Sequence, residues 1–400
     1  MTQPAILDLR DAGFWQDPYP QLRVAAQQHR LARTPQGEVM VLRADDVDLV
    51  QSHSAFAQPG LVSLERLGVS DGPFFDWRAL TMAVHDGERH DRLRASVIRA
   101  FTPRRVERLR SALAVHAAEV LQAASAAVTF DVVEEYAGDL PLWLICEFLG
   151  LPQSASAELD DLLTGTEEMF ADPLTPERRS RAEHGIVVLG EYVQQLVDER
   201  RHSPREDLVS DLLEAQTAGR LTYEELVSLV VNVLGGAVGS SRAGISNALY
   251  ELLRHPDQLA YVMADRDRLP AAVEECLRFH PPFRLGRRLV VEANDVLGVL
   301  LAPGSSVVIA RQAANRDPVR WSDPDAFDVR RKPERHYSFG YGAHFCLGQA
   351  LARLDIQEAV WTFFTTLPSV ALVTDQPRRV PFTADEQLEK LIVRPRACDS

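Results

Sequence analysis

The 400-residue chain has few cysteines, and none lies close to another in sequence. Cys146, Cys276, Cys346 and Cys398 are widely scattered, and there is no C-x-x-C pair. This spacing argues against the disulfide framework of small secreted proteins and against a structural zinc site. It favours a protein that works in a reducing, cytoplasmic setting.

Basic charge, long apolar runs and a leader-like N-terminus are lacking as well. The formal net charge of −14 argues against a protein that binds nucleic acid or an anionic membrane, because such proteins carry a basic surface. No run of roughly 18 or more apolar residues would form a membrane-spanning helix. The first residues, MTQPAILDLRDAGFW, do not have the charged-then-apolar layout of a signal peptide.

Apolar residues make up 46% of the chain, which is enough for a substantial core. Helical periodicity dominates, as at 182–200, where apolar residues recur every three or four positions. Strand-like runs are short and lie at 37–42, 287–310 and 369–374. No internal repeat or long linker divides the sequence. We therefore predict a mainly α fold with small β-sheets, in one domain over residues 1–400.

One long helix is predicted near the middle of the chain. Thr222 and Glu225 form a capping box at its start, and Pro256 ends it after about 33 residues, or roughly 50 Å. A helix of this length crosses a whole domain, so its middle lies deep inside. That middle, LGGAVGSSRAG at 234–244, contains four glycines, each of which costs about 0.8–1.0 kcal/mol relative to alanine. Such a weak turn calls for a functional reason.

The segment YSFGYGAHFCLGQALARLD at 337–355 is the strongest local pattern. Its motif, F-x-x-G-x-x-x-C-x-G, places Cys346 on a glycine-flanked loop just before a helix, where backbone amides and the helix dipole favour a thiolate. Glycines on both sides let the backbone approach a flat group closely. A thiolate beneath a flat macrocycle is one mode of haem ligation, and a buried structural cysteine is the alternative.

This segment resembles the haem-binding loop of the cytochrome P450 family, in its soluble bacterial branch. Further segments agree in the family's order along nearly the whole chain: DPYPQLR at 17–23, HDGERHDRLRASVIRAFTPRRVERLR at 85–110, AAVEECLRFHPP at 271–282, ANRDP at 314–318 and FDVRR at 327–331. The resemblance implies the family's fold, in which one long helix passes over a buried haem b (iron protoporphyrin IX). It also implies that Cys346 is the axial iron ligand.

The resemblance assigns further residues to the haem and its surroundings. The two haem propionates need cationic partners once buried. Arg288 is preferred over Arg287 because its spacing to Glu292 matches the family's strand, and a register shift of one residue would exchange the two. The residues assigned to the propionates are His90, Arg94, Arg288 and His344, and those assigned to the cysteine loop are Phe339, Gly342 and Gly348.

The E-x-x-R motif is present as Glu275 and Arg278, which share one helix face. With Arg331 they resemble the family's buried salt-bridge set. The role that this implies is structural, since the set supports the cysteine loop.

The family normally places A-G-x-(Asp/Glu)-Thr in the middle of its long helix. Small residues there admit dioxygen, and the acid and the alcohol relay protons to it. The residues aligned with this motif are Gly236, Ala237, Val238, Gly239 and Ser240. The small-residue gap and the hydroxyl are therefore kept, but Gly239 occupies the position of the acid. We predict Gly239, Ser240 and Ser241 as the catalytic segment.

The missing acid leaves three explanations of proton delivery open. Ordered water with Ser240 or Ser241 can suffice, which gives a monooxygenase with poorer coupling. A polar group of the substrate can complete the relay. Hydrogen peroxide, which already carries the protons, can replace dioxygen. Arg242 supports this third reading, because peroxygenases of the family hold a substrate carboxylate with an arginine in this helix. A salt-bridged or partly exposed arginine is the alternative.

The substrate pocket is predicted from the segments that face the substrate in the family. Aromatic side chains at 60–84 either stack on a planar substrate or pack in the core. An acid-poor site with aromatics also suits oxidative ring closure or coupling, in which oxygen need not be inserted. The predicted lining residues are Phe74, Phe75, Trp77, Gly235, Gly236, Val238 and Phe283.

Use of dioxygen requires electrons, and the chain has no flavin or iron–sulfur motif. The resemblance therefore implies a separate ferredoxin and ferredoxin reductase. Basic clusters can attract such an acidic partner or can be solvated helix faces; they contain Arg104, Arg105, Arg108, Arg110, Arg330 and Lys332.

The sequence thus predicts a haem-thiolate oxidoreductase of the monooxygenase type. Its expected substrate is a small apolar or aromatic molecule of bacterial secondary metabolism. The alternatives are a peroxide-driven peroxygenase and a non-catalytic haem-binding sensor or carrier.

Overall fold

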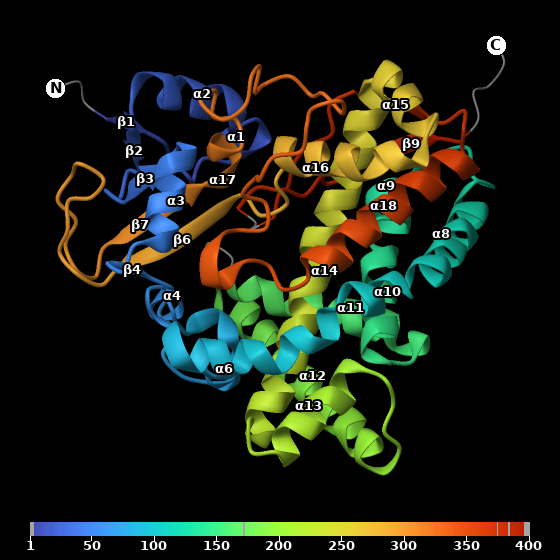
Figure 1. Ribbon diagram of the computed structural model, residues 1–400, viewed down its shortest axis with the longest axis horizontal. Helices are drawn as coiled ribbons and strands as arrows, with labels where there is room; N and C mark the ends of the chain where they lie inside the picture. The colour runs from blue at the N-terminus through green and yellow to red at the C-terminus, as the bar shows by residue number, and fades with distance from the viewer. Residues whose placement is uncertain (1–3, 171–172, 374, 383–384, 396–400) are drawn as a thin grey trace. The chain divides into compact units, whose positions relative to one another are not determined.

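The computed structural model describes residues 4–170, 173–373, 375–382 and 385–395, and Figure 1 labels their helices and strands. Internal contacts group the chain into two compact units. The first contains Met1–Ala57, Ala114–Leu140 and Ser240–Ser400, and the second contains Gln58–Leu113 and Pro141–Gly239. The expectation of one domain over the whole chain stays a prediction.

The first unit holds the strands of the described residues. A six-stranded sheet has the order β1-β2-β3-β7-β6-β4, and a three-stranded sheet has the order β5-β9-β8. The strands of the larger sheet are β1 (Ala5–Ile6), β2 (Leu31–Arg33), β3 (Val39–Val41), β4 (Phe56–Ala57), β6 (Leu285–Val290) and β7 (Ser306–Ala310). The smaller sheet contains β5 (Phe130–Asp131), β8 (Ala371–Leu372) and β9 (Ile392–Arg394).

The first unit also contains helices, which are labelled in Figure 1. They are α1 (Ala12–Gln16), α2 (Tyr19–Gln28), α3 (Ala44–Ser52), α9 (Val132–Glu135), α15 (Pro256–Met263), α16 (Leu269–Phe279), α17 (Arg311–Ala314) and α18 (Gln349–Thr366), with 3-10 turns at Arg266–Arg268 and Gly342–His344. Three further helices run from one unit into the other: α8 (Arg110–Ala124), α10 (Asp139–Leu149) and α14 (Tyr223–Arg254).

The larger sheet is buried on both faces, because successive side chains of a strand point to opposite sides. Val307 and Ile309 of β7 join a core cluster with α3, whereas Val308 and Ala310 join a second cluster with α1 and α2. The pairing of β6 with β7 is antiparallel and sets Arg288 opposite Val307. The hairpin thereby fixes the position of the arginine predicted to face a haem propionate.

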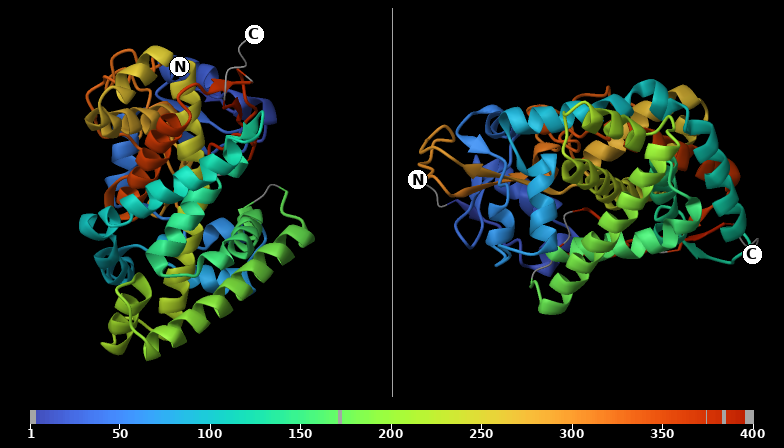
Figure 2. Two further views of the ribbon diagram at one scale, coloured as in Figure 1. Left: turned by 90° about the vertical axis from the view of Figure 1, so that its right-hand side faces the viewer. Right: turned by 90° about the horizontal axis from the view of Figure 1, so that it is seen from below.

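The second unit is helical. It contains α4 (Val62–Glu65), α5 (Pro73–Leu80), α6 (Gly87–Val97), α7 (Pro103–Glu107), α11 (Ser156–Glu167), α12 (Pro176–His202) and α13 (Leu208–Thr217), with 3-10 turns at Met82–Val84, Ile98–Phe101, Gln153–Ala155 and Glu168–Phe170. The long helix α12 packs against α5, α11 and α13 (Figure 2). Ile186, Leu189, Val193 and Leu196 are buried at three- and four-residue spacing, which explains why α12 docks along one face.

Helix α14 has the length and the start that the sequence predicts. The Thr222 Oγ1 accepts from the Glu225 amide at 3.1 Å, and a Glu225 carboxylate oxygen accepts from the Thr222 amide at 3.1 Å. The helix runs for 32 residues. By length and composition it could cross a membrane, but 61% of its most apolar window is buried in the structure. This burial is typical of a core helix.

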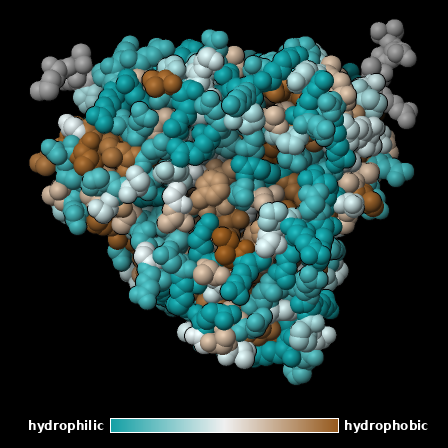
Figure 3. All heavy atoms as spheres, viewed as in Figure 1, coloured by the Kyte–Doolittle hydropathy of each residue, from teal (hydrophilic) through white to brown (hydrophobic). Residues whose placement is uncertain are grey.

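Figure 3 shows one face of the molecule, on which hydrophilic side chains predominate and hydrophobic ones form separate groups.

Two of the predicted strand regions are confirmed: residues 37–42 contain β3, and 287–310 contain most of β6 and all of β7. The run at 369–374 contains β8, although residue 374 lies outside the described residues. The two-residue strands β1, β4 and β5 were not predicted, because strands this short carry no periodicity of their own.

Candidate functional site

Cys346 lies on a tight loop between a 3-10 turn and α18. Its amide donates to the Phe339 carbonyl at 2.9 Å, which closes the loop upon itself. Gly340 and Gly342 both have φ of +73°, a conformation that favours glycine. A Cβ on Gly342 would also lie 3.3 Å from the Gln51 carbonyl oxygen. Gly342 of the motif and the neighbouring Gly340 are thus required by the backbone path.

The cysteine loop keeps accessible surface although it leads into a core helix. None of the residues 341–350 is buried, whereas Leu351 and Leu354 of α18 are. Gly348 is the N-cap of α18, so the free amides of the first turn follow Cys346 closely in the chain. An accessible, glycine-rich loop with a half-buried thiol fits a flat cofactor bound through sulfur.

Arg353 of α18 contacts the cysteine loop and supports it. The Arg353 guanidinium lies 4.3 Å from the centre of the Phe339 ring. Two nitrogens of Arg353 donate to the Glu274 carboxylate at 2.6 and 2.9 Å, and His336 Nε2 is 3.3 Å from the same carboxylate. Burial raises the pKa of Glu274, but His336 and Arg353 outweigh it and lower the pKa to about 2. The loop therefore rests on a permanently charged pair.

The structure brings Glu275, Arg278 and Arg331 together, as the family pattern implies. Arg278 donates to both Glu275 oxygens at 2.7 and 2.8 Å, and Arg331 Nε lies 3.3 Å from Glu275. Arg278 also donates to the carbonyls of Asn315 and Pro324, at 2.9 Å each. Glu275 and Arg278 are 3% and 2% exposed, so this charge is closed off within the protein.

Arg288 and His344 lie in the first unit with Cys346. Arg288 is buried on β6, and its Nη1 donates to the Arg287 carbonyl at 2.9 Å. Arg287 is exposed and lies 3.6 Å from Glu38. Of the two candidates, Arg288 is thus the one directed to the interior, in agreement with the register chosen from the sequence. His344 is half-buried in the 3-10 turn before Cys346.

Sequence reasoning missed Arg311, which follows β7 directly. Its Nη1 donates to the Leu285 carbonyl at 3.3 Å, and its buried Nε has no hydrogen-bond partner among the described residues. Burial and the nearby Arg288 charge lower the pKa of Arg311 to about 10, and the charges of Cys346 and Asp385 oppose this. No motif contains this arginine, so only the folded chain reveals it.

His90 and Arg94 lie on α6 in the second unit. His90 is 2% exposed, and its Nδ1 is 2.9 Å from the Asp91 carboxylate. Arg94 is half-buried. The helix is fixed by Arg92, which donates to both Glu225 oxygens at 2.7 and 2.8 Å. The propionate roles of His90 and Arg94 stay predictions from the family pattern.

The middle of α14 is open where the glycines lie. Gly235 and Gly236 are exposed, although the neighbouring turns are largely buried. A Cβ on Gly236 would meet nothing within 4 Å among the described residues, and one on Gly235 would meet only Leu163, at 4.0 Å. Of the other predicted residues there, Val238, Gly239 and Ser241 are buried and Ser240 is half-buried.

Arg242 points to the backbone beside α9. A Cβ on Gly138 would lie 3.3 Å from the Arg242 Nε and 3.0 Å from the Glu134 carbonyl oxygen. Arg242 is therefore used to pack this corner of the first unit. The half-buried position fits the alternative reading of a partly exposed arginine, and the peroxygenase hypothesis stays a prediction.

The aromatic residues of the predicted substrate pocket divide into two groups. Phe74 is 1% exposed and packs edge-on against Trp77 and Phe170, with ring centres 5.2 and 5.8 Å apart. This burial favours the core-packing alternative for Phe74, and its place in the pocket stays a prediction. Trp77 and Phe75 are half-buried, and Phe283 is 40% exposed.

The predicted basic clusters are largely neutralised. Arg105 pairs with Asp211, Arg108 lies 2.7 Å from Glu206, and Arg110 lies 2.6 Å from Glu107. Arg330 stacks on a ring instead, 4.3 Å from the centre of Tyr261, while Arg104 and Lys332 are exposed. These clusters give weaker support for an acidic partner than the sequence suggests.

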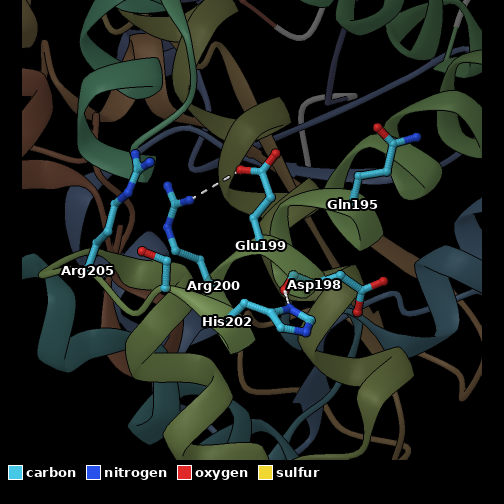
Figure 4. A pocket seen from close by; sticks show the side chains of 7 residues that line it. Gln195, Asp198, Glu199, Arg200, His202 and Arg205 are labelled. Carbon is cyan, nitrogen blue, oxygen red and sulfur yellow. Dashed lines mark hydrogen bonds and ion pairs between the residues drawn. The ribbon is translucent and has the colours of Figure 1, made fainter.

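A surface hollow of about 640 Å³ lies at the C-terminal end of α12 (Figure 4). Its labelled side chains come from one helix end and the loop after it: Gln195, Asp198, Glu199, Arg200, His202 and Arg205, with Ser203 completing the lining. Arg200 is 3.6 Å from Glu199, and His202 Nδ1 is 2.8 Å from the Asp198 carbonyl oxygen. It contains none of the predicted site residues, so we do not assign it to the active site.

Comparison with known proteins agrees with this geometry. Residues 166–369 match the sequence profile of the family "Cytochrome P450". The chain is 37% identical over 299 residues to 6-deoxyerythronolide B hydroxylase of Saccharopolyspora erythraea, covering 74% of this chain and 73% of that one. It is 34% identical over 384 residues to cytochrome P450 monooxygenase PikC of Streptomyces venezuelae, with coverages of 93% and 89%.

The crystal structure of CalO2 has the same fold. It matches with a TM-score of 0.92 and 30% sequence identity, over 98% of this chain and 99% of that one. The fold is thus mainly α with small sheets, as the sequence predicts. The chain belongs to the cytochrome P450 family and is a monooxygenase that uses the family's haem cofactor.

Proposed function

We propose that this monooxygenase oxidises a small apolar or aromatic molecule of bacterial secondary metabolism, by hydroxylation or by oxidative ring closure or coupling. The observation that carries the proposal is the accessible, glycine-built Cys346 loop, braced by Arg353 and followed by the first turn of α18. The relatives support the substrate class, since one is a hydroxylase named for 6-deoxyerythronolide B. We further propose haem b as the cofactor and the cytoplasm as its location.

We assign the roles in cofactor binding to individual residues. Cys346 binds the iron, and Arg288 and His344 pair with propionates, with His90 and Arg94 predicted to do the same. The bound haem supplies the site where dioxygen is activated. Gly235 and Gly236 leave room beside α14, because a side chain would fill the space that a Cβ finds open.

Proton delivery is the step in which this chain departs from its family. With Gly239 in place of the acid, only hydroxyl groups of α14 remain there, and we assign Ser240 and Ser241 with ordered water to the relay. A polar group on the substrate would complete the same path. Hydroxyl relays are weaker proton donors than carboxyl relays, so we expect lower coupling of electron use to product.

Dioxygen is the favoured oxidant, because Arg242 packs against Gly138 and does not support a peroxide-using site. Electrons then come from a separate ferredoxin and its reductase. The names of the relatives, a hydroxylase and a monooxygenase, favour an enzyme over a sensor or carrier.

The test compares oxidants and watches the haem. Candidate substrates are screened for the spectral shift that follows displacement of water from the iron, and binders are then incubated with a ferredoxin system or with hydrogen peroxide alone. Product formed with the ferredoxin system supports the proposal. Product formed only with peroxide contradicts the dioxygen assignment, and binding without any product contradicts an enzyme.

A further inference from the structure

Arg311 lies in the first unit at the junction of three segments. It is the first residue after β7, its Nη1 donates to the start of β6 at Leu285, and its Nη2 reaches the cysteine loop, 4.0 Å from where a Cβ on Gly340 would lie. The Phe283 ring is 4.9 Å from the guanidinium. The side chain is thus fixed in one place by strand, loop and ring.

The space that Arg311 occupies is made by a glycine. A Cβ on Gly286 would lie 3.2 Å from the Arg311 Nη2, so a larger residue on β6 would push the guanidinium away. Gly286 lies two positions before Arg288 on the same strand, and strand residues two apart share a face. Arg311 therefore extends the strand face that carries Arg288.

A second positive charge, that of Arg288, lies near Arg311. The Arg288 charge acts on Arg311, and Arg288 itself is 8% exposed. The Nε of Arg311 is buried without a hydrogen-bond partner, which is costly for a charged group. A ligand anion would remove both costs.

The geometry points to a haem propionate as this anion: we infer that Arg311, together with Arg288, binds one propionate of the haem carried by Cys346. The family places the haem at Cys346, and the Arg311 Nη2 lies 4.0 Å from where a Cβ on Gly340 of the cysteine loop would lie. A propionate stays in place through every turnover. A substrate carboxylate would leave the Arg311 guanidinium without its anion each time the product departs, so the permanent ligand is favoured.

The experiment measures how fast ferric haem leaves the holoprotein for an excess of apomyoglobin. Arg311→Met should release haem about ten-fold faster or more, because a charge-assisted hydrogen bond to a buried anion is lost. Arg311→Lys should fall between the two, because it keeps the charge and loses the planar fork. The same variants should lower the Fe(III)/Fe(II) midpoint potential, because an unneutralised propionate favours the ferric state.

Arg284→Met is the matched control. Arg284 is equally a buried arginine with unpartnered nitrogens, but it lies 4.9 Å from the Trp15 ring and donates to the Val380 carbonyl. It should lose stability and keep the wild-type rate of haem release. Equal release from both Met variants would overturn the inference, because the effect would then be general destabilisation.

Two further outcomes decide the matter. If Arg311→Met retains haem like the wild type but loses a preference for dodecanoic acid over dodecanol in binding titrations, the anion is a substrate carboxylate and the inference is wrong. If Arg311→Met fails to incorporate haem, resonance Raman spectra of Arg311→Lys replace it: the propionate bending band should shift, and an unchanged band contradicts the assignment. A wild-type protein without bound haem would instead refute the cofactor itself.

Discussion

Two arginine clusters of the first unit solve the same physical problem in opposite ways. Arg278 lies among Glu275 and two backbone carbonyls, so the protein itself neutralises and solvates its charge. Arg311 lies beside a second arginine and keeps a nitrogen without a partner. Every side-chain nitrogen of Arg278 has a hydrogen-bond partner, whereas the Nε of Arg311 has none among the described residues.

The difference separates structural charge from binding charge. A buried ion pair that is fully hydrogen-bonded does its work in the folded chain with or without a ligand. For Arg311 we assign the missing partner to an anion that arrives later, as a cofactor does. The same contrast holds for two glycines of α14: a Cβ on Gly244 would meet Ile356 at 2.8 Å, whereas one on Gly236 would find open space.

The largest effect is expected at Cys346, the residue that we assign as the iron ligand. Cys346→Ser should abolish turnover and remove the red-shifted band of the reduced carbonyl complex, because the thiolate that produces both is gone. Cys276→Ala is the control, since Cys276 is buried on α16 and its removal should lower stability alone. A normal carbonyl band in Cys346→Ser would mean that another residue binds the iron.

Loss of the ion pairs among Glu275, Arg278 and Arg331 should lower the stability of the protein. Glu275→Ala leaves Arg278 and Arg331 buried without their carboxylate and should lower the free energy of unfolding by about 3–5 kcal/mol. Urea unfolding at neutral pH measures this. Loss below about 1 kcal/mol would show that the cluster behaves like an exposed ion pair, and the contrast with Arg311 would fail.

Acid should weaken the brace under the cysteine loop. The pKa of Glu274 is lowered from 4.5 to about 2, so its contribution to stability is complete above pH 4.5 and is lost as the pH falls toward 2. Glu274→Gln should lose on the order of 3 kcal/mol at neutral pH, and its deficit against the wild type should shrink across that window. Urea unfolding at several pH values measures it. A deficit that does not change with pH contradicts the charged pair.

The smallest effect is expected from the two glycines of α14. Gly236→Ala should raise the stability of the haem-free protein by up to about 1 kcal/mol, because alanine favours the helix and its methyl group meets open space. Gly244→Ala should destabilise by about 1–3 kcal/mol, because Ile356 must shift. Thermal unfolding compares them. Equal effects would mean that the space at Gly236 is filled in solution.

The sequence allowed the prediction of the fold class, α14 and its capping box, because each rests on local periodicity or on residues three apart. The Cys346 loop could be predicted equally well, because its glycines meet conformational requirements of the backbone within ten residues. The buried position of Phe74 and the direction of Arg242 could not be predicted, because aromatic content and helix position do not specify which neighbours a side chain contacts. Arg311 was missed for a related reason: its importance lies in Arg288 and Gly340, which are distant in sequence.

The contact between Gly286 and Arg311 also constrains how this chain can vary. A Cβ on Gly286 would lie 3.2 Å from the Arg311 Nη2, so a larger residue at position 286 requires the Arg311 side chain to shift. Among relatives, a side chain at the first position should accompany a shorter residue at the second, which would appear as covariation in an alignment. Protein engineers who reshape this end of β6 would therefore need to mutate the two positions as a pair.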